Sequence, residues 1–236
     1  QGADAIYVGT PKFNARLRAR NFSFDELARL IAHAHGIRRK VFVTLNTLIK
    51  ETELPELVDT LQALRCIAPD ALIVQDLGVW RLARRLAPEI PLHASTQMTI
   101  HNLDGALEAA AMGFERVILA REMTLEEIAW IRSSCEIQLE TFVHGALCYS
   151  ISGQCNYSSY AHGKSANRGA CLQPCRRLYD IGADRAPAFA PLDLAAAPIL
   201  FQLIKAGIRS FKIEGRLKAA ETISRTVAAY RLLIDA

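Results

Sequence analysis

Short apolar runs alternate along the chain with longer amphipathic stretches, and this alternation constrains the fold more than any other feature. Seven of the runs are rich in Val, Ile, Leu or Phe and too short to be buried helices, which predicts β-strands. These runs are residues 5–9, 40–45, 71–75, 91–95, 115–120, 136–143 and 208–213. Strands that alternate with helices form a parallel sheet covered on both faces.

The stretches between the runs carry the start and stop signals of helices. Helices are predicted over residues 24–35, 54–65, 104–112, 125–133 and 219–233. Ser23 and Thr124 can cap two of them, because Glu26 and Glu127 stand three positions further on. Gly113 follows the third helix and can end it in a left-handed conformation.

Seven strands are one fewer than a closed barrel requires. We therefore expect a TIM-like (β/α)8 barrel whose first strand is missing, with residues 1–236 as a single barrel domain and a fragment of a longer protein. Gly2 and Ala3 then form the turn into the second strand. An open doubly wound sheet is the alternative, but no Gly-x-Gly-x-x-Gly follows any strand, which weakens its dinucleotide-binding version.

Composition limits the classes of protein to consider. The chain has 236 residues, 51% of them hydrophobic, but no apolar run long enough to cross a membrane. Its net charge of +4 permits a nucleic-acid partner without requiring one. Six cysteines in a chain without a visible export signal indicate metal ligands or catalytic groups rather than disulfides. We expect a cytoplasmic protein.

Polar residues gather where the predicted strands end. In parallel barrels the carboxyl ends of the strands build the active site. One such residue is usually a loop cap, but six strands that end this way favour a site. The residues are Asn46, Asp76, Ser95, Thr96, Gln97, Arg121, Glu122, His144, Lys212, Glu214 and Arg216.

Four cysteines lie in the one long irregular part of the chain, residues 145–200, which we expect to be a cysteine-rich insertion before the last strand. Their spacing is Cys148-x6-Cys155-x15-Cys171-x3-Cys175. Thiolates suit iron–sulfur clusters, zinc or copper(I). Structural zinc prefers closer pairs, and unliganded buried cysteines are the other alternative. The remaining two, Cys66 and Cys135, are predicted to be ordinary packing residues.

The stretch from Glu140 to Cys148, Glu-Thr-Phe-Val-His-Gly-Ala-Leu-Cys, followed by Ser-Gly-Gln-Cys at 152–155, closely resembles the signature of the U32 family. That family was named as peptidases after a collagenase-like protein. Further matches extend over residues 2–9, 43–46, 73–76, 93–97, 119–122, 165–169 and 211–216.

The resemblance implies a barrel and a [4Fe–4S] cluster held by Cys148, Cys155, Cys171 and Cys175. It also implies oxygen-independent hydroxylation of an RNA base, either an rRNA cytidine or a tRNA wobble uridine, with prephenate as the oxygen donor. Relatives hydroxylate a ring in ubiquinone synthesis, and some work as heterodimers, so a protein partner or homo-oligomer is expected. The Ser-Gly-Gln-Cys and Ser-Ala-Asn-Arg-Gly patterns are most similar to the rRNA cytidine branch.

Candidate roles follow from the chemistry of the strand-end residues. Cationic side chains can hold the donor carboxylates, and imidazoles can move protons near neutral pH. The carboxylates can act as bases or as ion-pair partners of the cations. The carboxylate-binding candidates are Arg121, Lys212 and Arg216. The catalytic candidates are His144, His93, Gln97, Glu122, Glu140, Lys212, Glu214 and Arg216. The candidates for phosphate contact are Arg16, Arg18, Arg20, Arg168, Arg176 and Arg177.

Two other functions compete with RNA hydroxylation. A collagenase-like peptidase needs a nucleophile with a base or a metal-activated water, yet neither His-Glu-x-x-His nor Gly-x-Ser-x-Gly is present. A non-catalytic, cluster-bearing partner subunit is the third hypothesis. One departure from the family also matters: many relatives carry Ser-x-Lys-Asp-Leu, whereas this chain has Leu192 before Asp193.

Overall fold

All seven predicted strands are present and pair in parallel, in the order of the sequence. The computed structural model describes residues 2–16, 19, 21–215 and 218–236. The sheet order is β1-β2-β3-β4-β5-β6-β10. The strands are β1 Ala5–Gly9, β2 Lys40–Leu45, β3 Ala71–Val74, β4 Leu92–Ala94, β5 Arg116–Ile118, β6 Gln138–Gly145 and β10 Ser210–Ile213. The predicted parallel α/β architecture is therefore confirmed.

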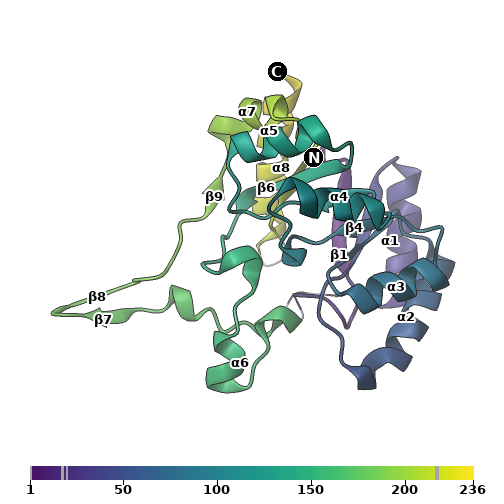
Figure 1. Cartoon of the computed structure of the whole chain (residues 1–236), viewed down its shortest axis with the longest axis horizontal. Helices are drawn as coiled ribbons and strands as arrows, with labels where there is room; N and C mark the ends of the chain where they lie inside the picture. Colours follow the sequence, from purple (N-terminus) through teal and green to yellow (C-terminus); the bar gives the residue numbers. More distant parts are fainter. Residues whose placement is uncertain (1, 17–18, 20, 216–217) are drawn as a thin grey trace.

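The sheet curls into a half-barrel rather than a closed barrel (Figure 1). Within the described residues, β1 and β10 are its two edge strands. Tyr7 Oη on β1 donates to the Ile213 carbonyl on β10 at 3.4 Å, so the two edges approach each other. The last helix is tied to both sides: Arg231 forms an ion pair with Asp4, and Tyr230 Oη donates to the Val143 carbonyl.

The helices cover the outer face of the sheet. They are α1 Phe24–Gly36, α2 Leu54–Ile67, α3 Leu77–Leu86, α4 Leu103–Ala111, α5 Leu125–Ser134, α7 Leu200–Lys205 and α8 Ala220–Asp235. The capping boxes predicted at Ser23 and Thr124 are both formed. Helix α7 was not predicted, and neither was helix α3. It begins at Asp76, whose carboxylate accepts from two backbone N–H groups of the first turn.

Alternation along each strand separates two cores. In β2, Val41, Val43 and Leu45 face the helices and belong to the large outer core. Phe42 belongs to the small inner core. The other buried members of the inner core are Ala71, Ile73, Ile118 and Phe142. The remaining inward positions are partly polar, which places charged groups inside the half-barrel.

Most of the cysteine-rich segment, residues 145–200, lies at the carboxyl ends of the strands, away from α7, and its last residues lead back to α7 (Figure 1). Its elements are η3 Ile151–Gly153, α6 Tyr157–His162, η4 Ala166–Ala170, η5 Pro174–Arg176, β7 Tyr179–Ile181, β8 Asp184–Ala186, β9 Leu194–Ala195 and η6 Ala197–Ile199. Strand β9 pairs antiparallel with the end of β6 and so joins this segment to the sheet.

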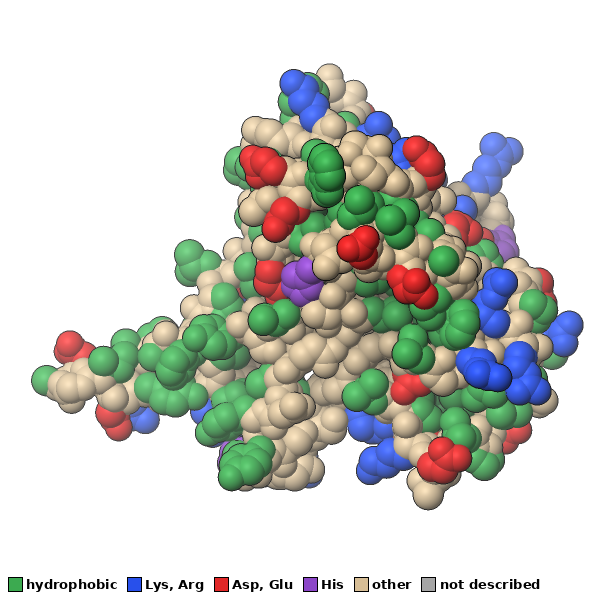
Figure 2. Space-filling view, viewed as in Figure 1, with side chains coloured by type: hydrophobic (Ala, Val, Ile, Leu, Met, Phe, Trp, Pro, Cys, Tyr) green, Lys and Arg blue, Asp and Glu red, His purple; other side chains and the backbone are tan. Residues whose placement is uncertain are grey.

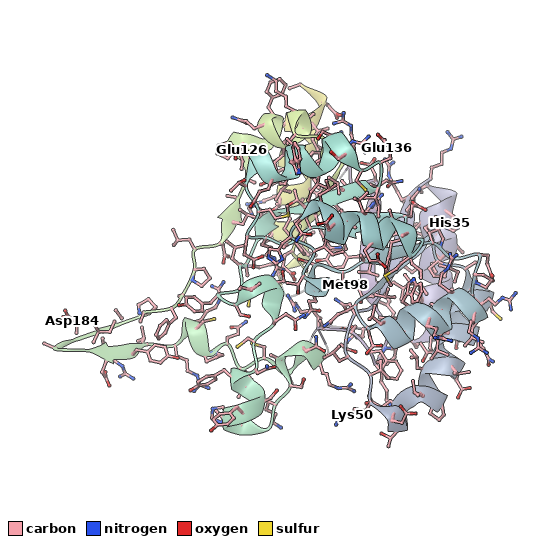
Figure 3. The ribbon with its side chains drawn as sticks, viewed as in Figure 1. His35, Lys50, Met98, Glu126, Glu136 and Asp184 are labelled. Carbon is pink, nitrogen blue, oxygen red and sulfur yellow. The ribbon has the colours of Figure 1, made fainter. Side chains whose placement is uncertain are left out.

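Strands β7 and β8 form a hairpin arm that extends away from the half-barrel, with Asp184 at its tip (Figures 1 and 3). Hydrophobic side chains cover much of this arm (Figure 2). Phe189 packs edge-on against Tyr149 and Tyr179, with ring centroids 5.6 and 5.1 Å away. Among the described residues, no helix combines the length and the apolar character that crossing a bilayer requires.

Candidate functional site

A cavity of about 410 Å³ opens at the carboxyl ends of the strands, beneath the cysteine-rich segment. Its floor is formed by inner-core side chains, including Ile73, Ile118 and Phe142. Polar side chains line its walls, among them Asn46, Gln97 and Arg121 at the ends of three strands. Among the predicted polar strand ends, those that line this cavity are Asn46, Ser95, Thr96, Gln97, Arg121, Lys212 and Glu214, whereas Asp76, Glu122 and His144 do not line it.

All four cysteines of the segment line this cavity. None of them forms a disulfide. The backbone N–H of Gln173 donates to Cys171 Sγ at 3.3 Å. Burial raises the pKa of the Cys148 thiol, opposed by the backbone N–H of Ser150 and by Arg121. Cys135 is buried as predicted, whereas Cys66 is exposed, so the prediction that Cys66 is a packing residue was wrong.

The cysteines do not converge on a single point. In the described part of the chain, no three His, Cys, Asp or Glu side chains are close enough to hold one metal ion. A structural zinc ion needs all its ligands around one centre. In a cubane cluster, by contrast, each thiolate binds a different iron, so the sulfurs surround a volume.

One anchor joins the cysteine-rich segment to the loops after β2 and β3. The Arg168 guanidinium pairs with both carboxylate oxygens of Glu53 and also donates to the Leu48 carbonyl. Asn167 Nδ2 donates to Gln75 Oε1 at 2.8 Å, and Asn167 Oδ1 accepts from the Leu48 N–H at 2.9 Å. Arg168 was a candidate for phosphate contact, but its guanidinium is already bound within the protein.

A second anchor joins the segment to the ends of β4 and β5. Glu122 accepts from the Ser152 backbone N–H at 2.7 Å, and His101 lies 3.4 Å from the same carboxylate. The side-chain NH2 of Gln154 donates to the backbone carbonyl of Gln97. Met98 belongs to η2 Thr96–Met98, which meets η3 at this boundary (Figure 3). Glu122 therefore positions the cysteine loop. It was predicted to be a catalytic residue, but it does not line the cavity.

Basic side chains outnumber carboxylates in the cavity. Its described lining includes one carboxylate, that of Glu214, and five cationic side chains: Arg16, Arg121, Arg176, Lys212 and Lys218. Four of the five have carboxylate partners. Arg16 pairs with Glu214 at 3.2 Å, and Arg176 and Lys218 pair with Asp193 at 3.2 and 3.6 Å.

Arg121 is the cation without such a partner. Its guanidinium lies over the Phe142 ring, 4.3 Å from the centroid, and forms no ion pair or hydrogen bond with any described residue. Burial lowers the pKa of Arg121, and the Glu214 carboxylate opposes this effect. A guanidinium has five N–H donors in a planar fork that matches carboxylate and phosphate groups. The side chain is thus available for an anionic ligand.

Lys212 reaches the cavity from a buried ion pair. Its Nζ lies 2.9 Å from Glu140 Oε1 and 4.3 Å from the centre of the Tyr7 ring. Glu140 also accepts from Arg116 and Ser210 at 3.0 and 2.7 Å. Burial alone would raise the pKa of Glu140, but Lys212, Ser210 and Arg116 lower it to about 2. Glu140 stays ionised and does not line the cavity, which argues against its predicted role as a base.

Neither histidine of the predicted set lines the cysteine cavity. His93 lies inside the half-barrel, 1% exposed, with its ring edge-on to Phe42. Burial and the nearby Arg116 lower the pKa of His93 to about 3, so it remains neutral at physiological pH. His144 lines a smaller cavity of about 70 Å³ beside α8 and packs against Tyr230. A proton-moving role at the cysteines is therefore not supported for either residue.

The other predicted positions are distributed as follows. Gln97, Lys212 and Glu214 line the cavity together with Arg121. Arg216, Arg18 and Arg20 lie outside the described residues. Leu192, at the position where the resemblance led us to expect lysine, is 88% exposed and does not line the cavity. That departure therefore leaves the described charges of the cavity unchanged.

Sequence reasoning missed the two anchors. In the first anchor, Asn167 and Gln75 are 92 residues apart in the sequence, and Arg168 and Glu53 are 115 residues apart. No local pattern marks either pair. Only the fold brings the Glu53 carboxylate to the cysteine-rich segment.

Comparison with known proteins assigns the chain to a protein family. Residues 1–236 match the family model described as peptidase family U32. The chain is 41% identical to the 23S rRNA 5-hydroxycytidine C2501 synthase of Escherichia coli, with all of this chain and 36% of that protein aligned. It is 34% identical to tRNA hydroxylation protein P1 of Bacillus subtilis, covering 59% of that protein. It is 30% identical to a collagenase of Porphyromonas gingivalis, covering 61%. The chain thus spans between about a third and three fifths of these relatives.

A solved structure supports the fold. The structure of a U32 peptidase aligns with 90% of this chain and 85% of its own, with a TM-score of 0.61. The two sequences are 16% identical, so this likeness concerns the fold alone.

Proposed function

The chain belongs to peptidase family U32, and from that premise we propose that it is the cluster-binding domain of an enzyme that hydroxylates an RNA base without molecular oxygen. One observation carries the proposal. The four cysteines line the same cavity as an excess of basic side chains. A redox centre held by these cysteines would therefore lie beside a bound anionic substrate.

The donor set suits a [4Fe–4S] cluster. Cys148, Cys155, Cys171 and Cys175 would each hold one iron, which agrees with four thiols that line one cavity without forming a one-ion site. The Gln173 N–H that donates to Cys171 Sγ would then tune the potential, as such hydrogen bonds do. When bound, the cluster supplies electron transfer, because four cysteine ligands leave no iron position open.

The hydroxyl group needs a donor. If the base exchanges C–H for C–OH while the donor exchanges C–OH for C–H, the base is oxidised by two electrons and the donor is reduced by two. A donor of the prephenate type carries carboxylates, which Arg121 can bind in bidentate fashion. Lys212 contributes positive charge but is already paired with Glu140, which makes Arg121 the main anchor.

The substrate is proposed to be RNA. The E. coli and B. subtilis relatives are named for rRNA and tRNA hydroxylation, and the chain has a net charge of +4. A base must leave its stack to enter a cavity of about 410 Å³. An rRNA cytidine is the first candidate and a tRNA wobble uridine the second. A cytoplasmic location and a protein partner or homo-oligomer belong to the same proposal.

Peptide hydrolysis is less well supported by the cavity, although a collagenase is among the relatives. A cysteine nucleophile needs a base within hydrogen-bonding reach. Neither His93 nor His144 lines the cavity, and no described histidine does. A non-catalytic partner subunit would not require the unpaired Arg121 guanidinium in the cavity.

Anaerobic purification with iron and acid-labile sulfide analysis tests the proposal first. We expect about four irons and four sulfides per chain in the wild type and loss of both in Cys171→Ala. Cys66→Ala is the matched control, because Cys66 is exposed and lies outside the cavity. The loaded protein should then hydroxylate RNA only when a prephenate-type donor is added. Zinc without sulfide after anaerobic reconstitution would refute the redox function.

A further inference from the structure

Two amide side chains meet on the wall of the cavity. Asn46 follows β2, and Gln97 lies in the η2 turn that follows β4. Asn46 Oδ1 accepts a hydrogen bond from the Ala15 backbone N–H at 3.2 Å. Asn46 Nδ2 donates to Gln97 Oε1 at 3.5 Å. Both side chains line the cavity.

This chain of hydrogen bonds fixes the orientation of both amides. A backbone N–H can only donate, so the Asn46 atom that faces Ala15 must be its oxygen. The Asn46 NH2 group then faces Gln97, whose side-chain oxygen accepts the hydrogen bond. Gln97 Nε2 forms no hydrogen bond with any described residue. What the pair offers a ligand is mainly N–H donors: one on Asn46 and two on Gln97.

We propose that Asn46 and Gln97 read the Watson–Crick edge of the substrate base and favour cytosine over uracil. This inference rests on the proposed RNA hydroxylation and deepens it. Cytosine has two adjacent acceptors, O2 and N3, which match two adjacent donors. Uracil carries a hydrogen on N3, so its N3–H would face the N–H groups of the amides. A base-reading site of this kind uses edge hydrogen bonds together with an apolar surface for the ring.

The rest of the cavity is consistent with a bound pyrimidine. Ile73, Ile118 and Phe142 provide the apolar floor on which a ring can lie. In a pyrimidine held by O2 and N3, C5 is on the far side of the ring from the amides. The amide pair carries no charge, and the nearest unpaired cation of the described cavity is Arg121, proposed above to hold the oxygen donor. Base and donor would thus use chemically different groups.

The change Gln97→Glu tests the proposal. It replaces the free NH2 by an acceptor oxygen of nearly the same shape, while the other carboxylate oxygen can still accept from Asn46. We would titrate the cluster-loaded protein, under anaerobic conditions, with two fluorescent RNA hairpins that differ only in one unpaired loop base, C or U. The wild type should bind the C hairpin about 10-fold to 100-fold more tightly, the usual cost of one mismatched buried hydrogen bond.

The variant should lose or reverse this preference. Gln202→Glu makes the same chemical change on the exposed face of α7 and should keep the wild-type ratio. Equal binding of both hairpins by the wild type, binding of neither, or an unchanged ratio in Gln97→Glu would each overturn the inference. A variant that weakens only the donor KM would overturn it too, since the amides would then hold the donor. The iron and sulfide content of the same protein is measured separately. Absence of the cluster would count against the proposed function, whereas an unchanged C-to-U binding ratio would count against the base-reading role alone.

Discussion

At the scale of single residues, Glu140 and His93 are both buried inside the half-barrel, and their different partners leave them in different charge states. Glu140 has three donors, so it keeps its charge and its pKa falls to about 2. His93 has cations nearby, and its Nδ1 has no hydrogen-bond partner within the described structure. It therefore stays neutral, with a pKa of about 3. A buried carboxylate stabilises this layer only because Lys212 and Arg116 face it.

The His93 shift predicts a loss of stability in weak acid. Between pH 6.5 and 3 the unfolded chain binds a proton that folded His93 excludes, so stability falls as pH falls, by up to about 1.4 kcal/mol per pH unit. Glu140 contributes its own loss only below its ordinary pKa of 4.5. From pH 6.5 to 5, His93→Phe should therefore remove about 2 kcal/mol of the pH dependence measured by urea unfolding. His162→Phe, at an exposed position, is the control; equal slopes in both variants would contradict the assignment.

At the scale of elements, the end of β6 depends on one glycine. Gly145 has φ +115°, and a Cβ at this position would lie 2.7 Å from both the Glu214 carbonyl oxygen and its Cβ. The two strands β6 and β10 approach here because Glu214 N donates to the His144 carbonyl. Two factors therefore disfavour any side chain at position 145: the left-handed backbone conformation and the contact with the Glu214 backbone, which cannot move away.

Gly145→Ala should therefore destabilise the protein by about 2–3 kcal/mol, measured by chemical unfolding. Gly163→Ala separates the two causes. Gly163 also has positive φ, +60°, but nothing lies within 4 Å of its added Cβ. That variant should lose only about 1 kcal/mol, the cost of the conformation alone. Equal losses would show that the contact with Glu214 contributes nothing.

At the scale of the whole molecule, the half-barrel and the cysteine-rich segment are held by different forces. The half-barrel has a continuous apolar core between sheet and helices. The segment has few buried apolar side chains and is tied down mainly by polar anchors such as Arg168–Glu53 and Glu122–Ser152. Local opening free energies are lowest where buried apolar contacts are few.

Native-state hydrogen exchange should reveal this difference. Amides of β2 to β6 are expected to exchange only by global unfolding, and those of residues 146–195 through local opening at least 100-fold faster. Removal of the proposed cluster by a chelator should speed exchange in the segment and leave the strands unchanged. Equal protection in both parts would contradict this account. If the strands also lost protection when the cluster is removed, the half-barrel itself would depend on the cluster.

The sequence by itself determined the strands, their parallel order and the cysteines. All seven strands were predicted because burial on both faces leaves a continuous apolar run that is legible locally. Helix α3 was missed, although Asp76, which begins it, was recognised as polar. The polar strand ends predicted where the cavity lies, since parallel strands bring their carboxyl ends to one edge.

Only the tertiary structure decided which polar residues face the cavity. His93 and Glu140 were predicted beside Gln97 and Arg121, yet the first two lie in the inner layer and the last two line the cavity. The sequence shows that a strand carries a polar residue, but not how deep in the half-barrel that position lies or which partner it finds. Asn46 and Gln97 are 51 residues apart, and their pairing follows from the curl of the sheet. Long-range polar contacts depend on geometry that no local pattern records.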